Sequence, residues 1–441
     1  MVMENRYDKY KDSGIAWIGE IPEHWDKNKI IRLFSIIGSG TTPKSSKEDN
    51  YIGSVNWIQS GDINGGYIEN CKNTISDTAL KEYPTLKIYK APFIIVAMYG
   101  ASVGNISISN IDGCVNQACC VMNETKQNFK YLFYAMNSVK RYLIYKAEGG
   151  GQPNISQDKI KNTWMPIPPF EEQQSIATYL DQKCGEIDEL ITLQEEMITK
   201  LQSYKQSVIT EAVTKGLDKN VPLKDSGIEW IGKIPEHWEA SKTLFSLSMP
   251  ITDGPHTTPE LFETGIPFVS AEAVSFGNGR IDFSHIRGYI SENFYQECCK
   301  KYIPQIDDIY MIKSGATTGR VAIVDTDIKF TIWSPLAVFR CNKERMLPRF
   351  LFYQLQSNGY QKQIELNWSY GTQQNIGMRT LEKLILSVPP LSEQQSIADY
   401  LDQKCCEIDE LISIKQQKIE KLKDYKKSLI FECVTGKRKV S

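Results

Sequence analysis

Two segments of this 441-residue chain each occur twice. Residues 11–25 (KDSGIAWIGEIPEHW) and 224–238 (KDSGIEWIGKIPEHW) agree at 13 of 15 positions. Residues 172–191 and 393–412 (EQQSIATYLDQKCGEIDELI and EQQSIADYLDQKCCEIDELI) agree at 18 of 20. In each copy, the long stretch between the 15-residue segment and the 20-residue segment has diverged widely. A duplicated frame around two unlike inserts predicts a pseudo-twofold internal repeat that holds two different domains in similar surroundings.

The repeated segment after each Pro-Pro pair is the clearest helix in the chain. Apolar residues recur there every seven positions, a spacing typical of a coiled coil. Each helix is expected to run about 40 residues, or roughly 60 Å at 1.5 Å per residue. The heptad residues that are candidates for a subunit interface are Leu180, Ile187 and Leu201 in the first copy and Leu401, Ile408 and Leu422 in the second.

Charge predicts how the two helices pair. The first half of the first helix is acidic, and the second half of the second helix carries a run of lysines from Lys415 to Lys427. Antiparallel pairing sets opposite charges against each other, whereas parallel pairing would stack the acidic halves. An alternative is that both helices pack on something else and expose solvated charged faces.

The repeat also predicts where the start of the chain lies. Residues 214–238 follow the first helix, and their counterpart, residues 1–25, opens the chain. No such segment follows the second helix. We therefore expect the N-terminal arm to pack beside the end of that helix, at residues 431–437.

The two diverged regions share their order of features. Each has a Thr-Thr-Pro loop (from Thr41 and from Thr257), short β-branched strands, a Gly-x-x-x-Gly turn, an aromatic helix (from Phe129 and from Arg349) and a polar loop before the Pro-Pro. The Gly-x-x-x-Gly segments, 100–104 and 315–319, lack a lysine and lie between strands, so we interpret them as tight turns rather than phosphate loops. Short strands mixed with a few helices predict an α+β class.

Composition permits DNA binding without requiring it. With 41% hydrophobic and 24% charged residues, the chain looks globular. Residues 26–168 hold 16 basic and 11 acidic residues (net +5), residues 239–388 hold 15 of each (net 0), and residues 170–213 hold 3 and 9 (net −6). The acidity is thus confined to the helix. No run of 18 apolar residues and no signal peptide is present, so we expect a cytoplasmic protein that does not enter a membrane.

Motifs for catalysis are missing. An amino-methyltransferase needs a polar residue before its Pro-Pro, but Ile167 and Val388 stand there. No G-x-x-x-x-G-K-[ST] occurs, and no Cys/His spacing suits a metal. His24 and His237 are repeat partners beside tryptophans, which favours a structural role. We expect no enzyme activity, no cofactor and no metal.

Recognition is the remaining function. Loops of both diverged regions are rich in Asn, Gln, Ser, Thr, Lys and Arg, which read base edges or hold phosphates. The candidate DNA contacts are Thr42, Lys44, Ser60, Tyr99, Ser102, Gln152 and Asn154 in the first region, and His256, Thr258, Lys313, Thr317, Thr318, Arg320, Tyr370, Gln373, Gln374 and Asn375 in the second.

Taken together, the KDSGI.WIG.IPEHW segments, the PP..EQQ.IA.YLDQK..EID.LI helices and the S-G-D-I and G-A-x-x-G turns resemble the specificity subunit of type I restriction–modification systems. The likeness covers essentially the whole chain. It implies two target recognition domains, each reading one half of an asymmetric split site on double-stranded DNA, and two helices that set the unread gap. It also implies binding to two methyltransferase subunits, which carry S-adenosylmethionine and flip the target adenine out, and to restriction subunits in the full complex.

This resemblance gives the expected domain limits: N-terminal arm 1–25, target recognition domain 26–168, central helix 170–213, linker 214–238, target recognition domain 239–388 and C-terminal helix 391–436. The chain departs from the pattern at two places in the second domain. Ala271-Glu272-Ala273 replaces Ser60-Gly61-Asp62, and Pro335 is expected where the first domain has Gln117. Two other interpretations stay open, namely a coiled-coil scaffold with two protein-binding domains and a fused methyltransferase or nuclease.

Overall fold

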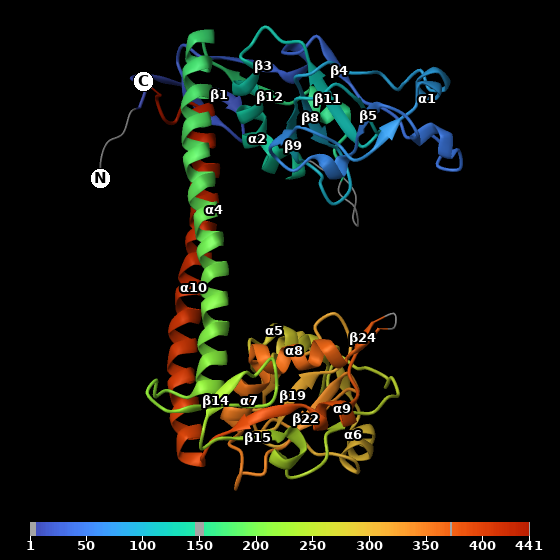
Figure 1. Ribbon diagram of the computed structural model, residues 1–441. Helices are drawn as coiled ribbons and strands as arrows, with labels where there is room; N and C mark the ends of the chain where they lie inside the picture. The colour runs from blue at the N-terminus through green and yellow to red at the C-terminus, as the bar shows by residue number, and fades with distance from the viewer. Residues whose placement is uncertain (1–5, 146–153, 371–372, 441) are drawn as a thin grey trace. The chain divides into compact units, whose positions relative to one another are not determined.

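The computed structural model describes residues 6–145, 154–370 and 373–440. The chain divides into two compact units, Met1–Gln194 with Gln417–Ser441, and Glu195–Gln416. Each unit contains mixed strands and short helices together with segments of two long helices (Figure 1). The expected α+β class is therefore confirmed, and each unit is described by itself.

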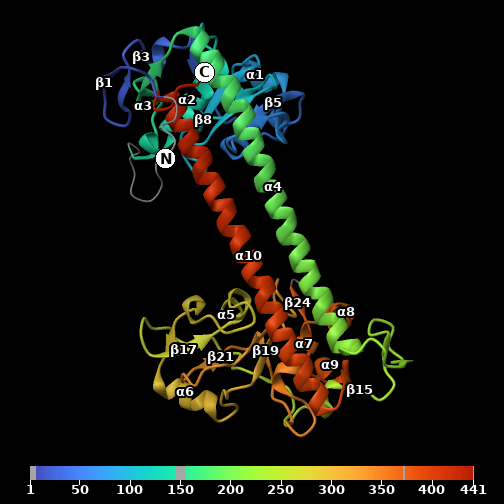
Figure 2. The ribbon, with the colours of Figure 1, turned by 90° about the vertical axis from the view of Figure 1, so that its left-hand side faces the viewer.

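The two long helices are α4 (Phe170–Lys215, 46 residues) and α10 (Leu391–Val434, 44 residues), drawn in two views in Figures 1 and 2. In the second unit, Lys205 on α4 bonds Asp409 on α10 at 2.7 Å, and Lys415 lies 3.2 Å from the Met197 sulfur. Numbers fall along one helix as they rise along the other, so the pair is antiparallel. In the first unit, Lys426 bonds Asp188 at 2.6 and 2.7 Å, the charge pairing that the sequence predicts.

The first unit is built on a five-stranded sheet in the order β4-β11-β8-β9-β6, with a three-stranded sheet β10-β5-β7 beside it. Pairs β12-β3 and β1-β2 complete it. Its strands are β1 (Tyr10–Ile15), β2 (Gly19–Pro22), β3 (Asp26–Lys29), β4 (Ile36–Gly38), β5 (Val55–Ile58), β6 (Tyr67–Ile68), β7 (Thr74–Ile75), β8 (Phe93–Ala97), β9 (Ile106–Ser109), β10 (Cys114–Val115), β11 (Cys119–Asn123) and β12 (Trp164–Ile167), and its short helices are α1 (Asp77–Glu82), α2 (Phe129–Tyr145) and α3 (Gln157–Lys161).

The second unit repeats this plan with a four-stranded sheet, β16-β22-β19-β20, and a three-stranded sheet, β18-β17-β21. Its strands are β13 (Leu223–Asp225), β14 (Lys233–Pro235), β15 (Glu239–Lys242), β16 (Thr252–Asp253), β17 (Ile266–Val269), β18 (Tyr289–Ile290), β19 (Ile309–Ile312), β20 (Val321–Ile323), β21 (Thr331–Ile332), β22 (Leu336–Phe339), β23 (Ser369–Tyr370), β24 (Gln374–Asn375) and β25 (Ile385–Val388), and its short helices are α5 (Ala271–Phe276), α6 (Glu292–Cys299), α7 (Pro348–Gln356), α8 (Asn358–Asn367) and α9 (Met378–Lys383).

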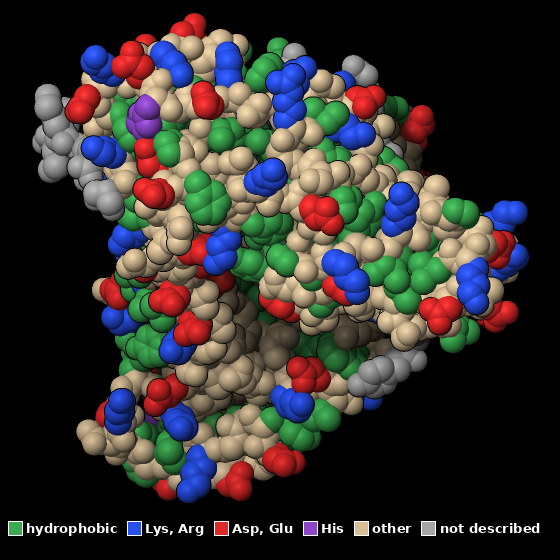
Figure 3. Space-filling view, turned by 90° about the horizontal axis from the view of Figure 1, so that it is seen from above, with side chains coloured by type: hydrophobic (Ala, Val, Ile, Leu, Met, Phe, Trp, Pro, Cys, Tyr) green, Lys and Arg blue, Asp and Glu red, His purple; other side chains and the backbone are tan. Residues whose placement is uncertain are grey.

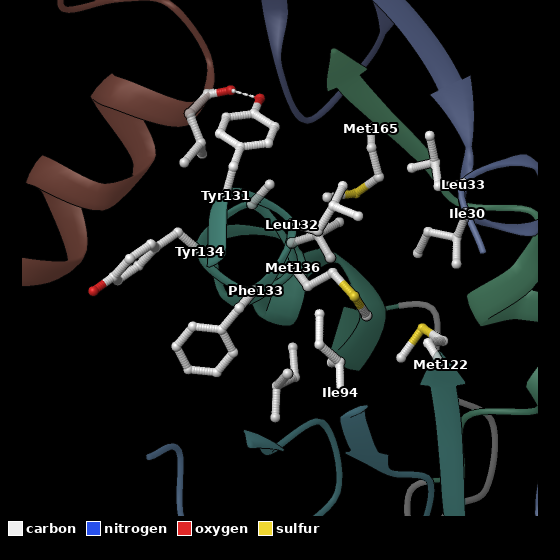
Figure 4. Packing of buried hydrophobic residues seen from close by; sticks show 14 of the residues in the cluster. Ile30, Leu33, Ile94, Met122, Tyr131, Leu132, Phe133, Tyr134, Met136 and Met165 are labelled. Carbon is white, nitrogen blue, oxygen red and sulfur yellow. Dashed lines mark hydrogen bonds between the residues drawn. The ribbon is translucent and has the colours of Figure 1, made fainter. Parts of the chain in front are cut away.

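The central strand of each main sheet is buried on both faces, because its side chains alternate between two cores. In β8, Ile94 and Val96 pack into the core that contains α2, whereas Ile95 packs with strands β5 and β10 on the other face. Leu132 and Met136 of α2 cover Ile94 (Figure 4). Strand β19 divides in the same way: Ile309 and Met311 enter one core, and Tyr310 and Ile312 the other. This burial explains why both strands are almost wholly apolar.

The aromatic helix expected from Arg349 is two helices, α7 and α8. Ser357 interrupts them with an extended backbone (φ −61°, ψ 148°), and its hydroxyl caps α8 by accepting a hydrogen bond from the Tyr360 amide at 3.3 Å. The short polar side chain at this cap is the physical reason for the break.

The repeated segments of the sequence bind each other. Glu172, at the start of α4, accepts hydrogen bonds from His24 (2.6 Å), the Trp25 indole (2.9 Å) and the Tyr7 hydroxyl (3.0 Å). Glu393, at the start of α10, is bonded in the same way by His237 (2.7 Å) and Trp238 (3.0 Å). The structural role expected for both histidines is therefore confirmed. We call the two sets of contacts the histidine–tryptophan–glutamate lock.

Within the first unit, the N-terminal arm packs on the end of α10. The Tyr10 hydroxyl donates to the carbonyl of Gly436 at 2.9 Å, and Lys437 donates to the carbonyl of Glu20 at 2.7 Å. Tyr131 on α2 also reaches this end of the helix, bonding the Val434 carbonyl at 3.2 Å (Figure 4). The described part of the arm, from residue 6, thus lies where the repeat predicts.

Candidate nucleic-acid interface

In the first unit, loops from five parts of the diverged region meet where β5 and β8 end. We call residues 39–44, 59–62, 99–105, 116–118 and 154 the first loop cluster. The Asn116 amide donates to the carbonyl of Ile58 (3.2 Å), and the Asn105 side chain donates to the carbonyl of Ile63 (2.9 Å). Thr42 donates to the side chain of Gln117. Residues up to 75 positions apart in sequence are thereby held in one surface.

In the second unit, the corresponding segments, one of which is most of helix α5, form the second loop cluster, residues 254–258, 270–275, 313–320, 333–335 and 373–375. The Gly315 amide donates to the carbonyl of Gln374 at 3.0 Å, and the Ser334 amide to that of Pro255 at 3.2 Å. Thr317 bonds Ser275 at 2.9 Å. Five segments are thereby held in one surface.

Both loop clusters rest on the same backbone hydrogen bonds. The Met98 amide donates to the Ala118 carbonyl at 2.7 Å, and the Lys313 amide to the Pro335 carbonyl at 2.8 Å. The carbonyls of Met98 and Lys313 accept from Ile155 at 2.8 Å and from Ile376 at 2.9 Å, respectively. The frame is therefore shared although the side chains on it differ.

The Gly-x-x-x-Gly segments close the antiparallel pairs β8-β9 and β19-β20. Gly104 and Gly319 each donate to the residue that ends the first strand, Ala97 and Ile312, at 2.8 Å. The prediction that they are tight turns is confirmed.

These hydrogen bonds correct one expected correspondence. Because Met98 and Lys313 occupy the same place, Pro335 corresponds to Ala118, and Ser334 rather than Pro335 corresponds to Gln117. The match between the two diverged regions was shifted by one residue because the sequence alone does not show the strand register.

A close backbone approach corrects a second correspondence, that of the two Thr-Thr-Pro loops. A Cβ on Gly40 would lie 1.6 Å from the carbonyl oxygen of Val115, and one on Gly254 would lie 2.0 Å from that of Ile332. Only glycine fits either place, so these two glycines are equivalent. Thr42 follows its glycine by two residues, as His256 does, whereas Thr258 follows by four. The matching Thr-Thr-Pro letters therefore do not mark matching positions.

The loop clusters differ most in charge. In the second, the buried carboxylate of Asp253 is bonded by Lys301 at 2.5 Å and lies 3.1 Å from His256 and 3.4 Å from Lys313. Burial alone would raise the pKa of Asp253, but the ion pair with Lys301, helped by Lys313 and His256, outweighs it and holds the pKa below its ordinary value. In the first cluster, Thr42 and Gln117 form a hydrogen bond between neutral side chains, and burial raises the pKa of Tyr99.

The structure brings most of the candidate DNA contacts into these clusters. Tyr99 and Asn154 face each other in a backbone bridge, as do Ser314 and Asn375. Those that lie in the first loop cluster are Thr42, Ser60, Tyr99, Ser102 and Asn154, and those in the second are His256, Thr258, Lys313, Thr317, Thr318, Arg320, Gln373, Gln374 and Asn375. Lys44 is the last residue of the 39–44 loop in the first cluster, and its amide donates to the Tyr83 hydroxyl (3.2 Å). Gln152 and the Tyr370 side chain lie outside the described residues.

Some residues in these surfaces were missed by the sequence analysis. Gln117 bonds Thr42 and accepts from Ser39 at its carbonyl. Trp333 lies beneath the guanidinium of Arg287, 4.5 Å from the ring centre. The only signal for them in the sequence is their position just after a short apolar strand, because their partners are distant along the chain.

The six candidate interface residues pack inside the chain itself. Leu180 and Ile187 are buried in the first unit, Leu401 and Ile408 in the second, and Leu201 and Leu422 are half-buried. These side chains therefore pack wholly or partly within the chain itself, and their role in binding a partner subunit stays a prediction.

On the face shown in Figure 3, basic and acidic side chains are interspersed, in keeping with the balanced charge of the chain. Among the described residues no group of His, Cys, Asp and Glu is arranged to hold a metal ion. Nor does the described part of the chain contain a helix that is long and apolar enough to cross a membrane.

Comparison with known proteins agrees with this architecture. A family model described as the type I restriction modification DNA specificity domain matches residues 22–202 and 255–424. The putative type I restriction enzyme MjaX specificity subunit of Methanocaldococcus jannaschii is 26% identical over 462 aligned residues, covering 100% of both chains. The EcoBI specificity subunit of Escherichia coli is 22% identical, covering 78% of this chain and 73% of its own.

A solved structure is similar over nearly the whole chain. It is described as the structural basis underlying complex assembly and conformational transition of the type I R-M system. The two chains superpose with a TM-score of 0.68 and are 17% identical in sequence. The match covers 94% of this chain and 98% of the other. This likeness shows a shared fold.

Proposed function

Because the chain belongs to the type I restriction–modification DNA specificity family, in which the specificity subunit is the non-catalytic member, we propose that its two loop clusters read the two halves of one split DNA site. Residues 26–168 form one target recognition domain in this proposal, and residues 239–388 form the other. The observation that carries it is the shared backbone frame with unlike side chains: Met98 and Lys313 make the same two hydrogen bonds but differ in charge. Two domains of the same architecture then recognise different base sequences, which makes the combined DNA site asymmetric.

The chemistry of the loop clusters suits base reading. Asn154 and Asn375 are exposed, and an amide side chain can bond adenine through two atoms. Arg320 is exposed in the second cluster, and arginine pairs in the same way with guanine. Hydroxyl groups such as Thr42 and Thr317, together with backbone amides of the turns, suit phosphate oxygens.

In this proposal α4 and α10 set the unread gap between the halves. A 46-residue helix is about 69 Å long, and modules about 34–36 Å apart on DNA face the same side of the duplex. Joining two weak readers in one chain raises their combined affinity through effective concentration.

The helices also offer the surfaces on which we propose that two methyltransferase subunits dock. Leu190, Leu193 and Tyr425 of the first unit are 43%, 48% and 52% exposed. Their repeat counterparts in the second unit are equally uncovered: Leu411 is 47%, Ile414 60% and Tyr204 56% exposed. A single exposed leucine needs no explanation, but the same apolar set occurring in both units supports two partners of one kind. Restriction subunits join through the same complex in this proposal.

The direct test replaces residues 26–168 with the corresponding domain of another specificity subunit and maps methylated adenines across a genome. One half of the methylated motif should change and the other should stay. The cognate chain with its own methyltransferase is the control. A change in both halves, or in neither, contradicts modular reading, and binding without sequence preference would favour a protein-binding scaffold.

A further inference from the structure

Asp253 stands out in the second unit as a carboxylate that is 1% exposed and surrounded by three basic side chains. Lys301 (50% exposed) follows helix α6, Lys313 (12% exposed) opens the Gly-x-x-x-Gly turn, and His256 (73% exposed) lies in the loop after β16. One carboxylate thus ties together three segments that are separated in the sequence, two of which belong to the second loop cluster.

The corresponding place in the first unit has no charge. Strand β4 pairs Gly38 with Val121, and β16 pairs Thr252 with Val338, so Ser39 and Asp253 each come next and correspond. Met98, 6% exposed, takes the place of Lys313. The neutral pair Ser39 and Met98 in one unit is therefore an ion pair in the other, on an otherwise identical frame.

The charge at Lys313 depends on Asp253. An ammonium group that is largely shielded from water is costly unless an opposite charge compensates it. Without the carboxylate, Lys313 has to move its charge to water, and because its backbone anchors Ile376 and Pro335, that movement shifts both the turn and the 373–375 loop. His256 loses its partner at the same time.

We propose that Asp253 is a positioning residue that determines which bases the second domain recognises, an inference that rests on the proposed function. It touches no base itself. It holds Lys313 and His256 so that the turn at 313–320 and the loop at 254–258 keep one relative arrangement, and it leaves Lys301 half-exposed beside them as a positive group for a DNA phosphate. Specificity in the second half of the site then depends on a buried group that direct contacts would not reveal.

A matched carboxylate in the same domain serves to distinguish the positioning role of Asp253 from a merely structural one. Asp308 is also 1% exposed and is bonded by Arg340 at 2.7 Å. It stands immediately before β19, whereas Lys313 stands immediately after it, so Asp308 lies at the end of the strand away from the second loop cluster. Loss of either carboxylate breaks a buried ion pair, but of the two only Asp253 is paired with residues of the second loop cluster.

The test uses the full chain with its methyltransferase and compares Asp253→Asn with Asp308→Asn. The readouts are the thermal midpoint and the rate of adenine methylation on DNA with single changes at each position of the site. We expect Asp253→Asn to lower discrimination at least tenfold in the second domain's half-site only, and Asp308→Asn to lower the midpoint without altering the letters. Equal effects of the two variants on the letters, or relaxation in both halves, would overturn the proposal.

A double variant covers the case in which Asp253→Asn fails to fold. Asp253→Ser with Lys313→Met installs the neutral pair found in the first unit, so no buried charge is left without a partner. We expect the thermal midpoint to recover while the letters of the second half stay altered. Recovery of the original letters would overturn the proposal. The exchange of residues 26–168 tests the proposed function separately, because it leaves this cluster untouched.

Discussion

Replacing Glu172 by alanine probes the lock between the two repeated segments. Glu172 accepts hydrogen bonds from Trp25, His24 and Tyr7, and Trp25 is fully buried. Its indole N–H cannot turn to water once the carboxylate is gone. The lock in the first unit should therefore open, and the N-terminal arm should loosen from the start of α4.

The expected loss in free energy of unfolding follows from the exposure of the three hydrogen-bond donors. A buried donor left without an acceptor costs about 1–3 kcal/mol, and each of the two partly exposed donors loses about 0.5 kcal/mol net because water replaces the carboxylate. The free energy of unfolding of the first unit should fall by about 2–4 kcal/mol. Glu393→Ala should cost the second unit less, about 1.5–3.5 kcal/mol by the same reasoning, because Asn220 stands where Tyr7 would be.

Glu171→Ala is the matched control. Glu171 is exposed at the same helix end, so its loss removes the favourable interaction with the helix dipole, about 0.3–1 kcal/mol, without touching the lock. Urea denaturation gives the free energies, and hydrogen exchange of peptides around Trp25 and Trp238 assigns each loss to a unit. A loss for Glu172→Ala no larger than that of Glu171→Ala would refute the reasoning.

The stabilisation that Glu172 contributes depends on pH with a definite sign. Burial alone would raise the pKa of Glu172, but the hydrogen bonds from Trp25, His24 and Tyr7 hold it below its ordinary value of 4.5. A carboxyl whose pKa is lowered by folding stabilises the fold above its unfolded pKa, and the contribution is lost as the pH falls through the folded value. The difference between the native chain and Glu172→Ala should therefore be constant above pH 4.5 and shrink at lower pH.

Two further predictions concern the long helices. Inserting four residues near Gln194, about one helical turn, should change the unread gap of the methylated motif and leave its letters; genome-wide mapping of methylated adenines checks this, and altered letters would rule out the spacer role. Leu190→Glu should weaken binding of one of two methyltransferase subunits, and Leu190→Glu with Leu411→Glu should weaken both, as measured by native mass spectrometry; unchanged stoichiometry at limiting concentration would exclude this docking face.

The sequence was sufficient to predict the frame of this molecule. The 15-residue and 20-residue repeats imply equal surroundings, and the structure gives them equal partners in Glu172 and Glu393. The acidic half of the first helix and the lysine-rich half of the second indicated the antiparallel sense because opposite charges attract where these halves lie side by side, and Asp188 with Lys426 is one such pair.

The loop contacts could not be predicted in the same way. Thr42 meets Gln117, and Asp253 meets Lys313, 60 residues away, only because β4 and β16 pair with the strands they do. A slip of one residue changes every such pair, and this is how Pro335 was first matched to Gln117. The break between α7 and α8 was missed because apolar residues continue on both sides of Ser357.

Every residue of the lock lies outside the diverged stretches. In the first unit it joins Tyr7, His24 and Trp25 to Glu172, and in the second it joins His237 and Trp238 to Glu393. An incoming domain therefore finds this anchorage already in place, but it also has to supply the contacts that its own aromatic helix makes with the long helices, such as Tyr134 with Asp181 and Tyr353 with Asp402. Recombination within the repeats can then exchange one diverged domain for another while the lock itself stays unchanged.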